Sequence, residues 1–293
     1  MDVKHRTIAT NGIELHAAVA GPDDGPTALL LHGFPDCWYG WHRQIEPLAR
    51  AGYHVVVPDQ RGYNLSDKPQ GIAAYDIDEL VRDVAGIIAG AEGRKRVCVA
   101  GHDWGAAVGW RLAETRPELL DRMVLVNAPH PAAMARHVRR SLGQLKKSWY
   151  ILFFQLPWLP EWLATRNDAV FLQRALLDSS APGTFSEADL AVYRAAWAQP
   201  GAVTAMIGWY RAAMRKVARP VPAGRRRRKP IEVPIRLIWG KGDPFLDSAM
   251  AQPSIERCPE GKLTFVEGAG HWVLHERPEL VSELMIEWFA AGS

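Results

Sequence analysis

Residues 97–105 read VCVAGHDWG, and this stretch decides the fold. A short apolar run ends at Gly101, an aspartate stands two residues later, and an alanine-rich segment of helical character follows Gly105. The pattern is typical of a nucleophile elbow, a sharp strand-to-helix turn that presents one side chain at the edge of a sheet. The two glycines suit such a turn because the strand and the helix must approach closely. The sequence therefore predicts that Asp103 stands at the tip of the turn.

The identity of Asp103 determines the chemistry that this turn predicts. A carboxylate nucleophile attacks a saturated carbon and forms an alkyl ester, whereas a serine would form an acyl enzyme. The residue therefore favours the opening of a ring or the displacement of a halide. The alternative is that Asp103 only shapes the turn, as aspartates in glycine-rich turns often do. The strand before it, the helix after it and the spacing of its partner residues favour the catalytic interpretation.

The flanking sequence predicts an α/β fold with a mainly parallel sheet and helices on both of its faces. An Asn-Gly pair at 11–12 indicates a type I′ turn in a hairpin over residues 5–20. Apolar runs predict buried strands at residues 28–31, 54–57, 97–100, 123–126, 235–239 and 263–266. Helical patterns start at Asp76, occupy residues 105–116 and recur at residues 280–289. Strands that alternate with helices indicate this fold class.

The alternation stops between residues 130 and 230. This segment has helical patterns and no candidate strand, and it holds five of the twelve tryptophans. We expect residues 130–230 to form a helical cap over the sheet edge at which ligands bind in α/β proteins. Residues 1–129 and 231–293 would then form the core. Taken alone, the aromatic content of the insert is also compatible with ordinary packing.

Cleavage of an alkyl ester on Asp103 needs activated water, and histidine is the usual base near neutral pH. His271 is the best placed of the ten histidines, because it lies in a glycine-rich loop between the last strand and the last helix. Asp243 follows the preceding strand and is predicted to orient the imidazole. The other usual position for this acid holds Asn127, which cannot ionise, and this favours Asp243 over Asp247. Each of these residues alone is compatible with a structural role.

Two backbone N–H groups are expected to stabilise the oxyanion that forms when water attacks the ester carbonyl. Trp104 follows the nucleophile and supplies one of them. Phe34 supplies the other from the His-Gly-Phe-Pro loop at residues 32–35. His32 and His102 are predicted to hold loops by hydrogen bonds and to take no part in the reaction.

The composition is that of an ordinary globular protein. The chain has 293 residues, of which 48% are hydrophobic and 23% charged, and its formal net charge is +3. This charge gives no argument for nucleic acid as a partner. The basic run at residues 225–229 is interpreted as part of an exposed, proline-rich connection back to the core, and a nucleic-acid patch is the alternative.

Cysteine usage and the N-terminus predict a cytoplasmic protein. The three scattered cysteines form neither a disulfide framework nor a metal-binding pair, which indicates a reducing compartment. The first residues lack the apolar centre of a signal peptide. The most apolar long stretch, residues 149–163, is interrupted by two prolines and is too short for a membrane span.

Three motifs of this chain are similar to those of one known family. Residues 32–35 resemble its oxyanion motif, residues 61–66 (RGYNLS) its Gly-x-small-x-Ser motif, and residues 101–105 its nucleophile motif. The family is that of the epoxide hydrolases in the α/β-hydrolase superfamily, in which the nucleophile, the acid and the histidine follow in this order. The resemblance covers nearly the whole chain. The basic run at residues 225–229 is its main departure.

The resemblance implies an activity and two further site residues. Members of the family convert an epoxide to a vicinal diol, and two tyrosines of the cap hold the epoxide oxygen. Residues 149–155 and 209–211 resemble the two tyrosine segments, which points to Tyr150 and Tyr210. A phenol with a pKa near 10 is a suitable proton donor to an alkoxide. Tyr193 matches neither segment and is interpreted as a packing residue; Tyr150 has the same structural alternative.

The implied reaction uses a small apolar epoxide and water, and needs neither a metal nor an organic cofactor. The sequence predicts no nucleic-acid partner and no membrane span, and it leaves open whether the chain forms a homodimer.

A haloalkane dehalogenase is the nearest alternative, because such enzymes share the aspartate nucleophile and often carry a tryptophan after it. Two observations disfavour this alternative. Phe34 stands where those enzymes often have asparagine, and a departing halide does not need a pair of cap tyrosines. A fluoroacetate dehalogenase would carry arginine in place of Trp104. A non-catalytic ligand-binding protein is disfavoured by the complete set of acid, base and nucleophile. The absence of serine at the elbow disfavours an esterase.

Overall fold

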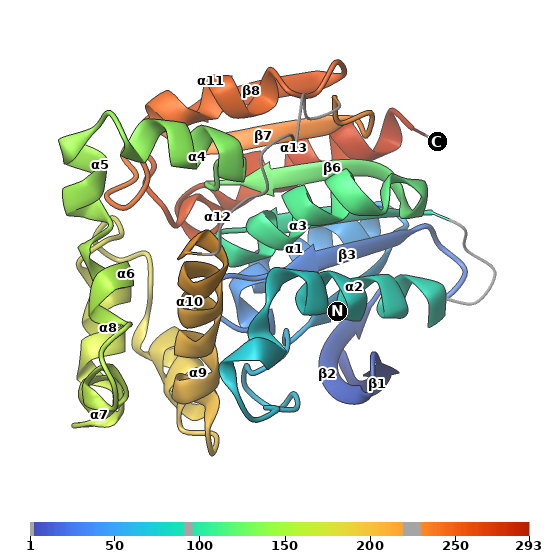
Figure 1. The fold of residues 1–293 in the computed structure, drawn as a ribbon. Helices are drawn as coiled ribbons and strands as arrows, with labels where there is room; N and C mark the ends of the chain where they lie inside the picture. Colours follow the sequence, from blue (N-terminus) through green and yellow to red (C-terminus); the bar gives the residue numbers. More distant parts are fainter. Residues whose placement is uncertain (1–2, 91–95, 219–229, 293) are drawn as a thin grey trace.

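The computed structural model describes residues 3–90, 96–218 and 230–292, and their strands form one eight-stranded sheet (Figure 1). The strand order is β1-β2-β4-β3-β5-β6-β7-β8. The pairs β1–β2 and β2–β4 are antiparallel, and the other five pairs are parallel. The bounds of the strands are β1 Lys4–Thr10, β2 Ile13–Ala20, β3 Thr27–Leu31, β4 His54–Pro58, β5 Val97–His102, β6 Leu120–Val126, β7 Ile235–Gly240 and β8 Gly261–Val266.

The N-terminal hairpin turns at the predicted pair. Asn11 and Gly12 both have positive φ angles, 45° and 76°, as a type I′ turn requires. Thr10 then pairs with Ile13, which sets the register of β1 against β2. The hairpin and all six predicted strands are confirmed, but only five of the six are buried as predicted. The sixth, β8, lies at the edge of the sheet, and Val266 is its only buried residue.

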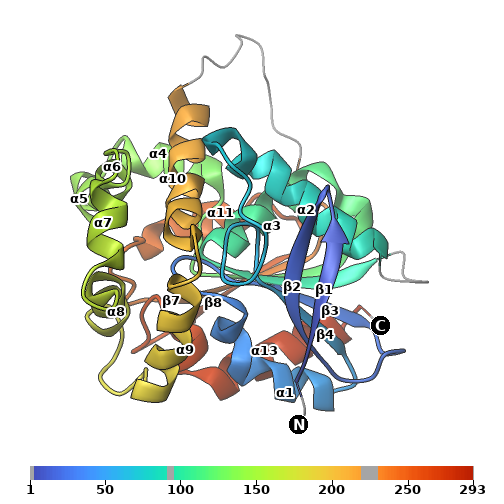
Figure 2. The same ribbon diagram turned by 90° about the horizontal axis from the view of Figure 1, so that it is seen from below.

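Alternating side chains divide the sheet into two faces. In β3, Leu29 and Leu31 pack into one hydrophobic cluster, while Ala28 and Leu30 pack into another. The first cluster includes α2 (Ile77–Gly90), α3 (Trp104–Thr115) and α11 (Ala251–Ile255), and the second includes α1 (His42–Arg50) and α13 (Pro278–Ala290). Figure 2 shows these two groups of helices on opposite sides of the sheet. Strands buried on both faces explain the continuous apolar runs of the sequence.

Seven helices, counted over the described residues, separate β6 from β7, and no strand lies among them. We call them the cap helices: α4 Pro131–Val138, α5 Leu142–Lys147, α6 Trp149–Phe153, α7 Leu159–Thr165, α8 Val170–Leu177, α9 Glu187–Trp197 and α10 Ala202–Ala218. In both ribbon views α10 lies between the column formed by α5 to α8 and the helices of the core (Figures 1 and 2). The basic run at residues 225–229 lies outside the described residues.

The remaining helical elements are short. They are the helix α12 (Val273–Glu276) and the 3₁₀ turns at Trp38–Trp41, Ile72–Tyr75, Pro117–Leu119 and Ser248–Met250. None of the helices in the described part of the chain has the length and apolar character needed to cross a membrane.

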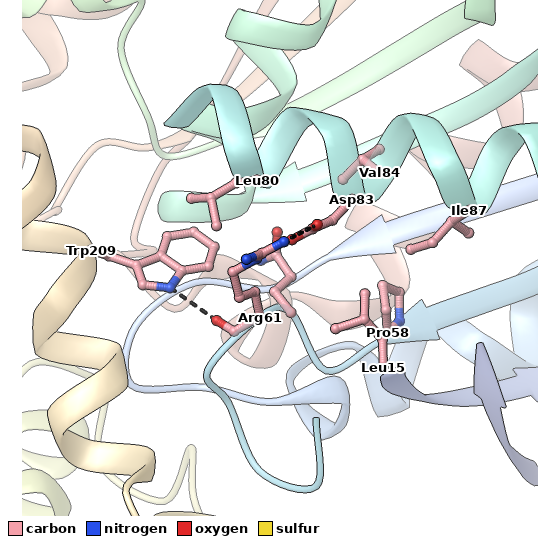
Figure 3. Close-up of a pocket in the computed structure, with 9 residues that line it drawn as sticks. Leu15, Pro58, Arg61, Leu80, Asp83, Val84, Ile87 and Trp209 are labelled. Carbon is pink, nitrogen blue, oxygen red and sulfur yellow. Dashed lines mark hydrogen bonds and ion pairs between the residues drawn. The ribbon is translucent and has the colours of Figure 1, made fainter. Parts of the chain in front are cut away.

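Side chains of α10 attach this helix to the core (Figure 3). The indole N–H of Trp209 donates to the carbonyl of Arg61 at 3.0 Å. The Arg61 guanidinium in turn forms a buried ion pair with Asp83 of α2, with Nε 2.7 Å from a carboxylate oxygen. Gly62 allows the close approach, because a Cβ there would lie 2.8 Å from the Cβ of Ala205. These contacts fix the position of α10, which carries Tyr210.

Candidate active site

Asp103 stands at the tip of the turn between β5 and α3. Its backbone angles, φ 51° and ψ −118°, lie in a region that side chains other than glycine rarely adopt. Glycine neighbours make the turn sterically feasible. A Cβ on Gly105 would lie 2.1 Å from the carbonyl oxygen of Leu31, and one on Gly101 would lie 2.5 Å from the carbonyl oxygen of Gly105. The motif therefore places the Asp103 carboxylate at the sheet edge, with 17% of the side chain exposed.

Two backbone amides meet the Asp103 carboxylate. Phe34 N–H donates to Oδ1 at 2.9 Å, and the backbone amide of Trp104, like that of Phe34, acts to lower the pKa of the carboxyl. Gly33 permits this contact, since a Cβ there would lie 2.4 Å from the Cβ of Asp103. The structure thus brings both amides of the predicted oxyanion hole to the predicted nucleophile.

His271 lies between two carboxylates. Its Nδ1–H donates to Oδ2 of Asp243 at 2.8 Å, which leaves Nε2 directed at Asp103. The Nε2 atom is 3.8 Å from Oδ2 of Asp103, too long for a direct hydrogen bond. Asp247 is engaged elsewhere, because its carboxylate bonds to His137 at 2.9 Å. The arrangement brings together the three residues that the sequence assigns to the nucleophile, the base and the acid.

The pKa values of these three groups respond to burial and to one another. Burial raises the pKa of Asp103 above its ordinary value, although His271 and the two amides act in the opposite direction. Burial also acts to raise the pKa of Asp243, but the charge of His271 and hydrogen-bond donors outweigh it and lower this pKa. For His271, burial lowers the pKa, but Asp243 and Asp103 together outweigh burial and raise it.

Asn127, which the sequence marks only as a position without an ionisable acid, contacts the site directly. Its Nδ2 donates to Oδ2 of Asp243 at 2.6 Å, and its Oδ1 accepts from the N–H of Gly240 at 2.9 Å. The other oxygen of Asp243 accepts from the backbone N–H groups of Phe245 and Leu246 at 2.7 and 2.9 Å. These three donors to Asp243 hold this acid ionised and fixed in orientation, and the bond from Gly240 fixes the Asn127 side chain.

His102 and His32 are structural, as their sequence context predicts. His102 Nε2–H donates to the backbone carbonyl of His271 at 2.9 Å, and burial together with the charge of His271 lowers the pKa of His102 to about 3. A neutral His102 therefore holds the loop that carries His271. His32 bonds to the carbonyl of Gly33 and accepts from the N–H of Gln60, both at 3.0 Å.

Tyr150 of α6 and Tyr210 of α10 lie together in an aromatic cluster that includes Trp104 and Phe34, the neighbours of Asp103. Their ring centroids are 5.8 Å apart at an interplanar angle of 82°. The Tyr210 ring also lies 5.0 Å from that of Trp104 and 5.2 Å from that of Phe34. Burial and the charge of Asp103 raise the pKa of both phenols above the ordinary value. Both tyrosines therefore remain protonated near neutral pH and can donate a proton.

Tyr193 belongs to a different part of the cap. It is fully buried on α9, and its ring stacks on Trp197 at 5.8 Å. The indole N–H of Trp197 donates to the carbonyl of Pro35, at 2.5 Å, so α9 contacts the loop that carries Phe34. The sequence signals no such contact, because the two residues lie 162 positions apart.

Among the described residues, no cluster of three or more histidine, cysteine, aspartate or glutamate side chains has a geometry that could hold a metal ion. The groups that the site offers are a carboxylate, an imidazole, two phenols and two backbone amides.

Comparison with known proteins places this geometry in a class. Residues 26–278 match the α/β hydrolase fold family. A protein of the AB hydrolase superfamily from Bacillus subtilis is 48% identical to this chain over 98% of both sequences. Epoxide hydrolase 2 from Caenorhabditis elegans is 35% identical, and the alignment covers 99% of this chain and 81% of that protein.

A solved structure has the same architecture. The Bacillus megaterium epoxide hydrolase, crystallised with an inhibitor, is 30% identical and superposes with a TM-score of 0.86 over 97% of this chain and 99% of that one. The chain belongs to the epoxide hydrolases of the α/β-hydrolase superfamily.

Proposed function

We propose that this protein hydrolyses an epoxide to a vicinal diol through a covalent ester on Asp103. One observation carries the proposal: a single carboxylate contacts the Phe34 and Trp104 amides and faces His271, beside a pair of protonated phenols. A carboxylate nucleophile suits attack on a saturated ring carbon, and phenols suit protonation of the alkoxide that leaves. Relatives named as epoxide hydrolases support the same reaction class.

In the first step, an oxygen of the Asp103 carboxylate attacks a ring carbon and the carbon–oxygen bond of the epoxide breaks. Tyr150 and Tyr210 hold the ring oxygen, and one of them gives it a proton. Because the pKa values of both phenols are raised by burial, the protonated form that this step needs predominates even in mildly alkaline solution. The product is an alkyl ester with a free hydroxyl on the neighbouring carbon.

In the second step, His271 removes a proton from water, which attacks the carbonyl carbon of the ester. The gap of 3.8 Å between Nε2 and Oδ2 of Asp103 is too long for a direct bond, so the imidazole is available to water. The Phe34 and Trp104 amides stabilise the oxyanion. Collapse of the tetrahedral intermediate breaks the ester's carbon–oxygen bond, and the departing alkoxide takes the proton held by His271, which releases the diol. The Asp103 carboxyl then loses the proton that arrived on the water oxygen; this proton restores the tyrosine through solvent, and the carboxylate is regenerated.

The two steps are coupled through charge. The negative charge of Asp103 is one cause of the raised pKa of His271. Ester formation removes that charge, so the pKa of the imidazole falls at the stage at which it must be neutral to act as a base. Formation of the ester therefore increases the fraction of His271 that can activate water.

We further propose that residues 130–230 act as the cap, since both phenols come from this segment and the other site residues come from outside it. The aromatic surroundings of the phenols favour a small apolar epoxide as substrate. The chain's three cysteines are free and buried, which supports a reducing compartment such as the cytoplasm.

The deciding experiment is a panel of aryl and alkyl epoxides, with diol detection, run beside a panel of haloalkanes with halide detection. We expect diol formation that is lost in Asp103→Asn, a variant of nearly the same shape. Asp247→Asn is the matched control and should retain turnover, because Asp247 bonds to His137 and not to His271. Halide release without diol formation would instead identify a haloalkane dehalogenase. Ligand binding without any turnover would identify a non-catalytic protein.

A further inference from the structure

Helices α5 and α6 carry a row of exposed apolar side chains. Backbone bonds from Ser148 N–H to Gln144 and from Ile151 N–H to Ser148 continue the helical pattern across the junction of the two helices. Residues spaced by three and four positions therefore lie on one face. Four exposed residues of α5 and α6 have this spacing, and a fifth, Leu156, lies in the turn that follows α6. We call these five the apolar stripe: Leu142, Leu145, Trp149, Leu152 and Leu156.

The opposite face of the same helices already packs against the rest of the protein. Gln144 is buried and donates to the carbonyl of Phe245 at 2.8 Å, and Phe154 is buried beside Tyr210. The apolar stripe is therefore not a displaced part of the core. Leu142 is 78% exposed and Leu152 is 61% exposed, which exceeds what core packing leaves open. An apolar row of this length on a surface marks an interaction site.

Basic side chains accompany the stripe. Residues 131–160 contain five lysines and arginines and no aspartate or glutamate, although the whole chain has a net charge of only +3. Four of the five are Arg136, Arg139, Arg140 and Lys146. Within residues 3–90, 96–218 and 230–292, no ion pair involves any of these four. Lys147 instead donates to the carbonyl of Asp243 at 3.0 Å.

We propose that this face docks on the surface of an anionic phospholipid membrane. The apolar stripe would enter the boundary between headgroups and acyl chains, and the basic side chains would contact lipid phosphates. Trp149 and Trp158, which is 69% exposed, are of the residue type that favours this boundary. A lipid surface supplies apolar and anionic groups together, and its fluid headgroup layer can adapt to the shape of the apolar stripe.

Two further observations favour this partner. Figures 1 and 2 both place α5 and α6 at the outer side of the cap helices, away from the sheet, where a flat surface can reach them. A second copy docked through the same face would bring no carboxylate from residues 131–160 to pair with the basic side chains. The charge of the face is therefore complementary to anionic lipid and not to itself. The proposal does not depend on the reaction at Asp103.

Vesicle sedimentation of the full chain tests the proposal. The vesicles contain either phosphatidylcholine alone or phosphatidylcholine with roughly a third of phosphatidylglycerol. We expect binding to the anionic vesicles at about 0.1 M NaCl, and at least tenfold weaker binding both to neutral vesicles and at about 0.5 M NaCl, where charges are screened. No sedimentation with anionic vesicles, or equal sedimentation with both kinds, would overturn the proposal.

Variants separate the two components of the surface. Leu142→Gln with Leu152→Gln should weaken binding at least tenfold, and Arg139→Gln with Arg140→Gln should do so by a similar factor and reduce the salt dependence. Leu65→Gln is the matched control, because Leu65 is 58% exposed on the loop after β4. Thermal melting checks that each variant is folded. Undiminished binding by either double variant would overturn the proposal.

Sedimentation velocity without vesicles tests whether a second copy of the chain, and not lipid, covers the apolar stripe. We expect the wild-type chain and Leu142→Gln/Leu152→Gln to have the same oligomeric state. A wild-type dimer that this double variant converts to a monomer would assign the apolar stripe to a second copy of the chain and would overturn the membrane proposal.

Discussion

The core and the cap helices position their site residues by different means. In the core, Asp103 and the amides of Phe34 and Trp104 lie on tight turns at strand ends. The neighbouring positions in these turns hold glycine because they have no space for a Cβ. In the cap, Tyr210 projects from α10, which Trp209 attaches to the core, and Tyr150 projects from α6, which follows α5 and its bond from Gln144 to the carbonyl of Phe245. We infer that the reaction proposed for Asp103 depends on backbone geometry. Proton donation by Tyr150 and Tyr210 would instead depend on how firmly the cap helices are held on the core.

The strongest test of this difference is His271→Gln, which should block the core's second step and leave the first intact. Without an imidazole no group activates water, so turnover should fall by roughly 10⁴-fold or more. The alkyl ester on Asp103 should accumulate, and the mass of the intact protein should increase by that of the epoxide. His137→Gln is the control, because His137 bonds to Asp247 outside the site. If the mass does not change during substrate exposure, the two-step scheme is wrong.

Asp243→Asn should reduce turnover on the order of 10²–10⁴-fold, because the acid that orients the imidazole becomes neutral. The charge of Asp243 raises the pKa of His271. In the wild type, hydrolysis of the ester should therefore fall as the pH decreases through this raised pKa. In the variant, the same acid limb should move to lower pH. A pH profile of single-turnover ester hydrolysis measures both limbs, and an unmoved limb would contradict this role for Asp243.

Tyr150→Phe and Tyr210→Phe should each slow ring opening by about 10-fold or more, and the double variant by roughly 10²–10⁴-fold. Burial raises the pKa of both phenols, so ring opening in the wild type should show no alkaline limb up to about pH 10. Stopped-flow measurement of ester formation isolates this step. Tyr193→Phe should leave the rate unchanged, because Tyr193 packs on Trp197. Equal rates in the double variant and the wild type would exclude the phenols as acids.

Trp197→Phe should have the smallest effect and should sharpen the comparison of the two regions. The substitution leaves the buried carbonyl of Pro35 without its indole donor, at a cost of about 1–3 kcal/mol in the free energy of unfolding. Denaturant unfolding measures this loss. Trp162→Phe is the control, because the Trp162 ring is half exposed on α7. A stability equal to that of the control would show that this bond contributes little to holding α9 on the core.

The sequence was sufficient to predict the core because its signals are local. The run that precedes Asp103 and the glycines around it define a strand and a turn within nine residues, and β5 differs only in extending to His102. The helix predicted from residue 105 begins at Trp104. The strand bounds agree to within a few residues, because strands that are buried on both faces appear in the sequence as continuous apolar runs.

The contacts that complete the site could not be predicted, because their partners are distant in the chain. Asn127 bonds to Asp243 across 116 residues, and nothing near Asn127 indicates that contact. The sequence predicts that residues 130–230 are helical, but it does not predict where each cap helix begins and ends. Trp158 and Ala169 both have positive φ angles and immediately precede α7 and α8, and no glycine marks either position in the sequence. The order of the strands likewise depends on the packing of the whole sheet.

The hydrogen bonds of Asn127 have a consequence for how such a protein can change. This side chain ties the end of β6 to the end of β7 and to Asp243, although more than a hundred residues leave the sheet between the two strands. The positions of Asp243 and His271 should therefore not depend on the length or sequence of the segment between β6 and β7. A different set of helices grafted between β6 and β7 should therefore change which molecules bind, while the positions of Asp243 and His271 stay the same.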